Sequence, residues 1–190
     1  ARDSLLVCDS FLRTQERYLG EWATRIQALE AAGLMADRDV ALADREAFKQ
    51  ETGRIRDGVE LLRKHDDLRY CFQWMNEAMG AAIRIQGKTF TGWHLFQLGF
   101  ILTQIRSIYE RHAAADELRG SMESADVLWF ATGGGKTEAY LGIISMALLY
   151  GRLKGRDHGT TAWLRFPLRM LSVQQFQRLS YVLAQTNKIR

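Results

Sequence analysis

The stretch that decides the fold reads Val127-Leu128-Trp129-Phe130-Ala131-Thr132-Gly133-Gly134-Gly135-Lys136-Thr137-Glu138. Its first four residues are apolar and of strand-forming type, three glycines follow, and the apolar run over 139–150 is typical of a helix. Strand, glycine loop and helix in this order are typical of a phosphate-binding P-loop. The stretch therefore predicts an α/β fold with a phosphate site between a strand and a helix.

The loop carries residue types that suit a nucleotide. Glycines let several backbone N–H groups point at one anion, and the helix that opens at Lys136 adds its positive dipole end. Lys136 is predicted to neutralise β- and γ-phosphate oxygens, and the Thr137 hydroxyl to hold Mg²⁺. ATP and Mg²⁺ are the cofactors we expect, with Lys136 and Thr137 as catalytic residues. The predicted cofactor-binding residues of this stretch are Thr132, Gly133, Gly134, Gly135, Lys136, Thr137 and Glu138.

One position departs from the strict P-loop template, which wants a glycine where Phe130 stands. That position is relaxed in many helicases, so the departure favours them over other nucleotide enzymes. A glycine-rich turn beside an ordinary surface lysine remains the alternative. The similar Gly87-Lys88-Thr89 lacks a preceding glycine run and is interpreted as a loop.

Composition and charge bound the classes of protein that are possible. The chain has 190 residues, is 47% hydrophobic and carries a net charge of +4, as expected of a globular protein. Residues 151–190 hold eight basic side chains and one acidic one, which indicates either a nucleic-acid track or a solvated face. Because the chain starts at Ala1 without a methionine, we expect a piece of a larger protein.

The sequence favours a cytoplasmic protein. Cys8 and Cys71 match no metal or redox spacing, which suits a reducing compartment, and no secretory signal is visible. The longest apolar run, over 139–150, is about half of what a bilayer crossing needs, so no membrane association is expected.

The first 86 residues are predicted to be α-helical. Apolar or neutral residues over 4–32 recur in steps of three and four, the pattern of a helix that packs along another helix. A second helix over 37–64 would form an antiparallel hairpin with the first, and a third is expected over 66–85. The hairpin carries no chemistry that we can name, so a structural role is favoured.

Gln97 interrupts the apolar stripe of a helix predicted from Trp93 to about Arg111. Ile101, Ile105 and Ile108 share its face, so the amide of Gln97 would be buried and would need hydrogen-bond partners. An adenine edge would satisfy the amide on both sides. A backbone amide would do the same, and the residues alone leave both open.

A second strand over 160–166 and a helix from about Ser172 are predicted after the P-loop helix. Strand, helix, strand and helix in this order imply a parallel sheet with right-handed crossovers. The segment Pro167-x-Arg169-x-Leu171-x-x-Gln174 resembles motif Ia of superfamily 2 helicases, which lies along the nucleic-acid backbone. The resemblance implies nucleic-acid contacts by Arg169, Ser172 and Gln174, and it makes Gln97 a candidate for the adenine-reading Q motif.

A closer resemblance covers roughly residues 60–190. The segments around Phe96-Gln97-Leu98-Gly99-Phe100, the P-loop and Gln174-Gln175-Phe176-Gln177-Arg178 are similar to those of helicase subunits of the DISARM anti-phage defence system. Ala131 departs from that family's usual proline, and Phe166-Pro167 replaces its tyrosine–threonine pair. A different defence-associated helicase of the same superfamily therefore stays open. The resemblance implies that residues 87–190 begin a RecA-like motor domain 1, truncated after motif Ia. It also implies DNA and a second DISARM core subunit as partners.

Several parts of a helicase motor are missing from the chain. A RecA-like sheet needs about five strands, only two are predicted, and no acidic Asp-Glu box follows the P-loop. We therefore expect the intact protein to be an ATP-dependent helicase or translocase, and these 190 residues alone to be inactive in ATP turnover. Two alternatives stay open: a kinase-like P-loop enzyme, and a non-catalytic nucleic-acid-binding module with a vestigial P-loop.

Overall fold

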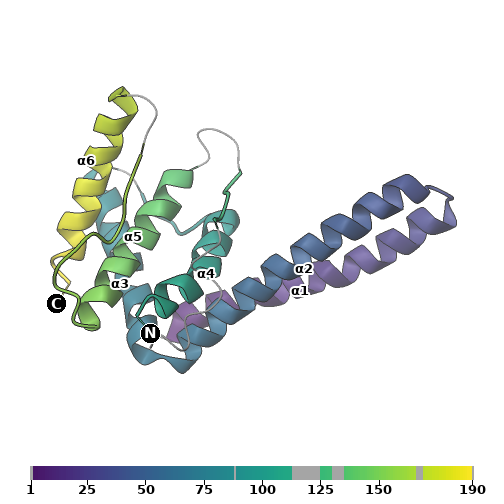
Figure 1. Ribbon diagram of the computed structural model, residues 1–190, viewed down its shortest axis with the longest axis horizontal. Coiled ribbons are helices and arrows are strands. Elements are labelled where there is room, and N and C mark those ends of the chain that lie inside the picture. Colours follow the sequence, from purple (N-terminus) through teal and green to yellow (C-terminus); the bar gives the residue numbers. More distant parts are fainter. Residues whose placement is uncertain (1, 88, 113–124, 130–134, 166–168, 190) are drawn as a thin grey trace.

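A computed structural model describes residues 2–87, 89–112, 125–129, 135–165 and 169–189 of the chain. Within these ranges the chain forms helices and no strand (Figure 1). The helices are α1 (Arg2–Ala31), α2 (Met35–Lys64), α3 (Asp66–Ile85), α4 (Leu95–Glu110), α5 (Lys136–Leu153) and α6 (Arg169–Thr186). The predicted helices over 4–32, 37–64 and 66–85 are all found, and the third matches at both ends.

The predicted α/β fold is wrong for the described residues, because neither candidate segment forms a strand. Residues 125–129 and 162–165 have no regular secondary structure, and Val127, Trp129 and Trp163 are 87%, 93% and 87% exposed. A strand needs a neighbour whose N–H and C=O groups pair with its own, and an isolated pair of strands is marginal in water. The apolar composition of these segments was therefore a misleading signal, and the parallel RecA-like sheet is absent from the described part of the chain.

Helices α1 and α2 form the predicted antiparallel hairpin, which projects from the rest of the molecule as an arm (Figure 1). Gly33 makes the turn with a φ of 73°, a left-handed conformation that favours glycine. In the outer part of the arm Trp22 stacks on Phe48, and Tyr18 meets Phe48 edge-on with ring centroids 5.4 Å apart. The arm is thus held together by its own small apolar interface.

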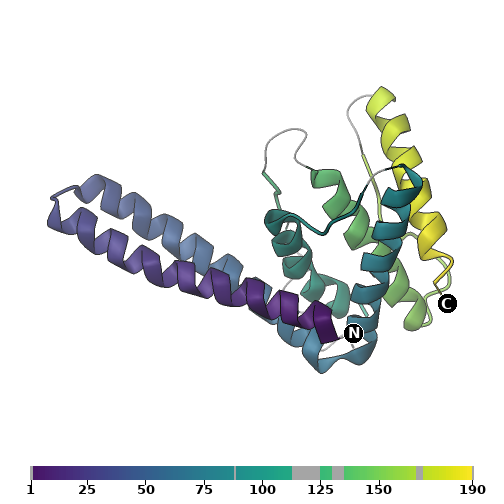
Figure 2. The same ribbon diagram turned by 180° about the vertical axis from the view of Figure 1, so that it is seen from behind.

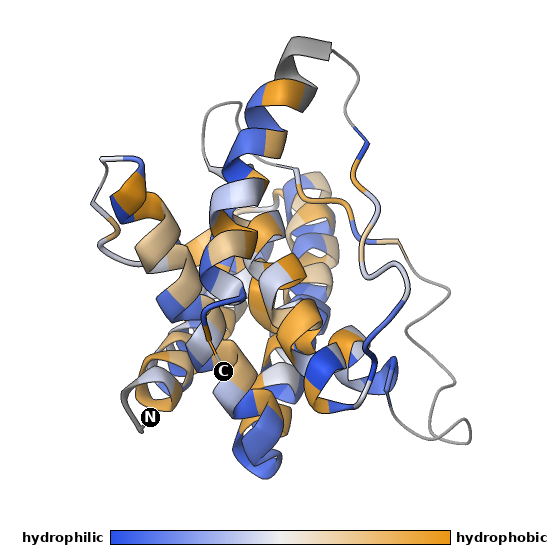
Figure 3. Cartoon of the chain, turned by 90° about the vertical axis from the view of Figure 1, so that its left-hand side faces the viewer, coloured by the Kyte–Doolittle hydropathy of each residue, from blue (hydrophilic) through white to orange (hydrophobic). Residues whose placement is uncertain are grey.

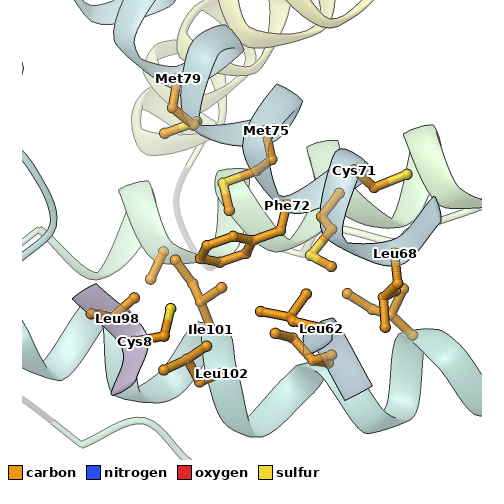
Figure 4. Close-up of a cluster of buried hydrophobic side chains, with 14 of the residues drawn as sticks. Cys8, Leu62, Leu68, Cys71, Phe72, Met75, Met79, Leu98, Ile101 and Leu102 are labelled. Atoms are coloured by element: carbon orange, nitrogen blue, oxygen red, sulfur yellow. The ribbon is translucent and has the colours of Figure 1, made fainter. Parts of the chain in front are cut away.

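The main core lies where the inner half of the hairpin meets α3, α4 and α5 (Figure 4). The labelled side chains in that view include Cys8, Leu62, Phe72, Met75 and Ile101, all of them buried. These residues come from four different helices, so the core joins the arm to the rest of the fold.

Gly58 explains how α2 approaches α4 so closely. A β-carbon at this position would overlap the carbonyl oxygen of Leu102. The glycine that weakens α2 in isolation is therefore required by the packing of two helices.

Helix α5 lies against α3 and α4, and α6 covers α3 and α5 on the side away from the arm (Figure 2). Hydrophobic residues gather among the central helices (Figure 3). The hydrophobic cluster runs from Cys8 to Val182 and so includes residues on both sides of the predicted domain boundary after Gln86, a boundary that stays a prediction. No helix in the described ranges is both long enough and apolar enough to cross a membrane.

Candidate nucleotide-binding site

The start of α5 is the centre of the candidate site. The helix begins at Lys136, as predicted, and Gly135 precedes it with a φ of 86° and a ψ of 23°. This left-handed conformation is available to glycine at little cost. Thr132, Gly133 and Gly134, the other predicted loop residues, lie outside the described residues. Free N–H groups in the first turn of a helix and the positive end of its dipole suit an anion.

Gln97 of α4 is buried beside Gly135, with only 4% of its surface exposed. Its Oε1 accepts a hydrogen bond of 2.8 Å from the backbone N–H of His94, and its Nε2 donates one of 2.7 Å to the carbonyl oxygen of Gly135. Both ends of the amide therefore bind backbone groups, one of the two arrangements expected from the sequence. Contact with adenine stays a prediction for this residue.

Glu138 lies in the first turn of α5 and connects Gly135 to α6. Its backbone N–H donates a 3.2 Å hydrogen bond to the Gly135 carbonyl, the same oxygen that Gln97 contacts. Its Oε1 forms an ion pair with the guanidinium of Arg178 on α6. Its Oε2 is buried and has no hydrogen-bond partner among the described residues. Such an atom is costly to leave unsatisfied, so a water, an ion or a ligand group that binds it would be favourable.

A cavity of about 400 Å³ adjoins these residues. Gln97, Gly135, Glu138 and Arg178 contribute its polar wall, and the segment between α3 and α4 contributes an aromatic wall that includes Phe90 and Trp93. The volume lies in the range of small-molecule pockets, which usually combine apolar walls with a few fixed polar groups. The cavity is therefore a suitable place for part of a nucleotide.

The predicted magnesium ligand, Thr137, is half-buried in the first turn of α5, as is Lys136. In the part of the chain that is described, no group of three or more His, Cys, Asp or Glu side chains is placed to hold a metal ion. Mg²⁺ at nucleotide sites takes one or two protein ligands and completes its shell with phosphate oxygens and water. The Thr137 hydroxyl and the unpaired Oε2 of Glu138 fit this small donor set.

Asp126 anchors the segment that leads into the glycine loop. Arg54 of α2 contacts both of its carboxylate oxygens at 2.7 and 2.8 Å, and Gln104 of α4 donates a further hydrogen bond of 2.7 Å. The Arg54 hydrogen bond, with help from Gln104, outweighs partial burial and lowers the pKa of Asp126. The base of the arm is in this way tied to the start of the candidate site.

Sequence reasoning gave no role to Asp126 or to Arg178. Arg54 is 72 residues from Asp126 in the chain, and Arg178 is 40 residues from Glu138. No spacing rule joins residues so far apart. A charged residue directly before an apolar run was the one available signal for Asp126.

Helix α6 carries the three predicted nucleic-acid residues. It begins at Arg169, three residues before the expected start at Ser172. The side chains of Arg169 and Ser172 lie outside the described part, and Gln174 is exposed. Gln174 and Arg178 are four residues apart and therefore share a face of the helix.

A second cavity, of about 500 Å³, lies at the other end of α5 and is rich in arginine. Arg111 and Arg156 in its wall already donate hydrogen bonds to the carbonyl oxygens of Thr161 and Thr160, at 3.1 and 2.8 Å. Thr160 and Thr161 lie in the segment between α5 and α6, so these hydrogen bonds fix that segment in place. We interpret this cluster as structural.

The fold and the site together define a helical protein whose glycine-capped helix start faces a polar and aromatic cavity. No family model matches the chain. The chain is 35% identical over 150 residues to the DISARM protein DrmA of Bacillus paralicheniformis, a match that covers 66% of this chain and 13% of that protein. The chain thus spans a small part of its relative's length. This identity supports the relationship to DISARM proteins that the sequence predicts.

Proposed function

We propose that the chain supplies the nucleotide-binding part of an ATP-dependent DNA helicase or translocase that acts in anti-phage defence. The observation that carries the proposal is the buried amide of Gln97 bound to the carbonyl of Gly135 at the start of α5. This contact holds the end of a glycine loop in one position beside a helix N-terminus, where phosphate is favoured. The relationship to a DISARM protein supports the defence role.

The phosphates of ATP would bind to backbone N–H groups of Gly133 to Gly135 and of the first turn of α5. Lys136 would neutralise developing negative charge on the phosphate oxygens, and the Thr137 hydroxyl would orient the bound magnesium complex. When present, Mg²⁺ supplies charge neutralisation between neighbouring phosphates. The aromatic wall of the cavity around Phe90 and Trp93 would take up an apolar face of the nucleotide.

DNA would bind at the beginning of α6. Arg169, Ser172 and Gln174 offer a guanidinium, a hydroxyl and an amide, the donors that proteins use on phosphate oxygens. Two exposed apolar side chains, Val173 and Phe176, lie among them and could contact unstacked bases. The proposed DNA site and the proposed nucleotide site are then joined by α6.

The test uses the full-length protein with Lys136→Ala. We expect ATP turnover to be lost and affinity for a single-stranded oligonucleotide to be retained, because Lys136 acts on phosphate oxygens of the nucleotide. Lys154→Ala is the matched control, since it removes the same charge from the other end of α5, where Lys154 pairs with Asp67 in a partly exposed ion pair. If Lys136→Ala turns over ATP as the control does, Lys136 is not a catalytic residue and the proposal is wrong. If the wild type and both variants bind the oligonucleotide equally and none turns over ATP, the protein is a non-catalytic nucleic-acid-binding module.

A further inference from the structure

Arg178 lies at the point where α6 changes from an anchored helix to a projecting one. On its C-terminal side, Val182 is buried and the hydroxyls of Ser145 and Thr186 form a buried hydrogen bond of 2.8 Å that fixes α6 to α5. On its N-terminal side, Val173 and Phe176 are 65% and 70% exposed. This half of α6 rises clear of the neighbouring helices (Figure 1).

The ion pair between Arg178 and Glu138 is the contact that joins this boundary to the candidate nucleotide site. Each side chain is about a quarter exposed, so the pair is partly shielded from water. The Oε2 of Glu138 faces Gly135, where a β-carbon would lie 3.4 Å from it. The Glu138 carboxylate thus has one oxygen on the Gly135 side, without a hydrogen-bond partner among the described residues, and pairs with α6 through the other.

Arg178 and Gly135 also line the same cavity, so the guanidinium is within the region where phosphate is proposed to bind. Polyphosphate in that region would compete with Glu138 for the guanidinium, because a phosphate group offers more charge and more acceptor oxygens than a carboxylate. This competition weakens the ion pair when nucleotide is present.

We propose that the Glu138–Arg178 ion pair couples nucleotide binding at the start of α5 to nucleic-acid binding by the projecting half of α6. This inference rests on the proposed function, since it assigns a regulatory link to the same site. Without nucleotide the ion pair holds the projecting half in one orientation, and with nucleotide the guanidinium changes partner and the orientation changes. Nucleotide and nucleic acid would then each bind the two orientations of α6 with different affinity. Such a difference in affinity is the requirement for coupling between two sites.

The test measures this coupling in the full-length protein. Fluorescence anisotropy gives the Kd of a labelled oligothymidylate without nucleotide and with a non-hydrolysable ATP analogue, and the ratio of the two values is the coupling factor. The reciprocal ratio, the Kd of the analogue with and without the oligonucleotide, must agree by linkage. We expect the wild-type ratio to differ from one by at least about fivefold.

Arg178→Gln and Glu138→Gln should each bring the ratio to about one, because either change removes the ion pair. Arg178→Lys keeps a charge and should keep most of the coupling. The charge exchange Glu138→Lys with Arg178→Glu should restore part of the ratio that either reversal alone removes. Lys188→Gln is the control, because it removes a basic side chain just beyond the anchored end of α6 and should leave the ratio unchanged. Thermal unfolding of every variant checks that each one folds.

A ratio in Arg178→Gln equal to that of the wild type would overturn the inference, as would a wild-type ratio of one. If the wild type binds the analogue in a manner that depends on Lys136, either result leaves the proposed function standing and removes only the coupling. If the wild type does not bind the analogue at all, both the proposed function and the inference are wrong. Loss of coupling in both glutamine variants, with its partial return in the charge exchange, would support the inference.

Discussion

The amide of Gln97 on α4 and the carbonyl oxygen of Gly135 before α5 form a hydrogen bond of 2.7 Å across 38 residues of sequence. Because Gln97 also caps the start of its own helix through the N–H of His94, one side chain fixes the beginnings of two helices. The position of the proposed phosphate site therefore depends on α4 as much as on the glycine loop.

Gln97→Ala should destabilise the protein by about 1–3 kcal/mol, because the N–H of His94 and the carbonyl of Gly135 each lose a part-buried hydrogen bond. Urea unfolding measures this cost. Gln97→Glu keeps the acceptor for His94 but loses the donor for Gly135. It should therefore raise the Kd of the nucleotide above that of the wild type. Equal nucleotide affinity in wild type and Gln97→Glu would contradict the proposed link to the site.

Gly58→Ala should cost at least about 1–3 kcal/mol, since the added methyl group would overlap the carbonyl oxygen of Leu102 and force α2 away from α4. Gly53→Ala is a matched control five residues earlier on the same helix, where a β-carbon meets nothing within 4 Å. That change should stabilise the protein by up to about 1 kcal/mol. Chemical denaturation of both variants gives the comparison, and equal effects would contradict the close approach of the two helices.

Asp126→Asn should destabilise the protein at neutral pH and much less in acid. The pKa of Asp126 is lower in the folded chain than its ordinary value of 3.8, so its charged form favours folding at pH values above 3.8. This contribution is lost as the pH falls through the folded-state pKa. Unfolding of wild type and variant at neutral pH and near pH 3 should show the gap between their free energies of unfolding closing in acid.

Cys8 and Cys71 should react very slowly with thiol reagents in the folded protein. Both are buried, and burial, aided by nearby carboxylates, raises the pKa of each thiol to about 12. Since the thiolate is the reactive form, a thiol-specific dye should label neither residue until the protein is unfolded. Rapid labelling of the native protein at neutral pH would contradict the packing of α1 and α3 in the core.

The helices could be predicted because their information is local. The alternating steps of three and four over 4–32 and the apolar face of 66–85 depend only on the period of the helix, and both were found. The burial of Gln97 also followed from its place on an apolar stripe. The prediction of strands was wrong because a strand forms only when its backbone pairs with that of a neighbouring strand. The period of a single segment does not reveal such a neighbour.

The contacts of the site were largely beyond prediction. Pairs such as Glu138 with Arg178 and Asp126 with Arg54 arise only when packing brings separate helices together. Gln97 had two candidate partners on the sequence evidence, a base edge and a backbone amide, and the distinction required the position of Gly135. Helix period places residues on a face, but it does not say what the face meets.

The outer end of the arm is a suitable position for a fluorescent label. Helix α2 has 30 residues and is about 45 Å long, so the turn at Gly33 lies far from the start of α5. With both native thiols buried, a cysteine introduced at the exposed Ala36 would be the preferred position for a dye. Such a probe would report rotation and approach to a partner without disturbing the cavity beside Gln97.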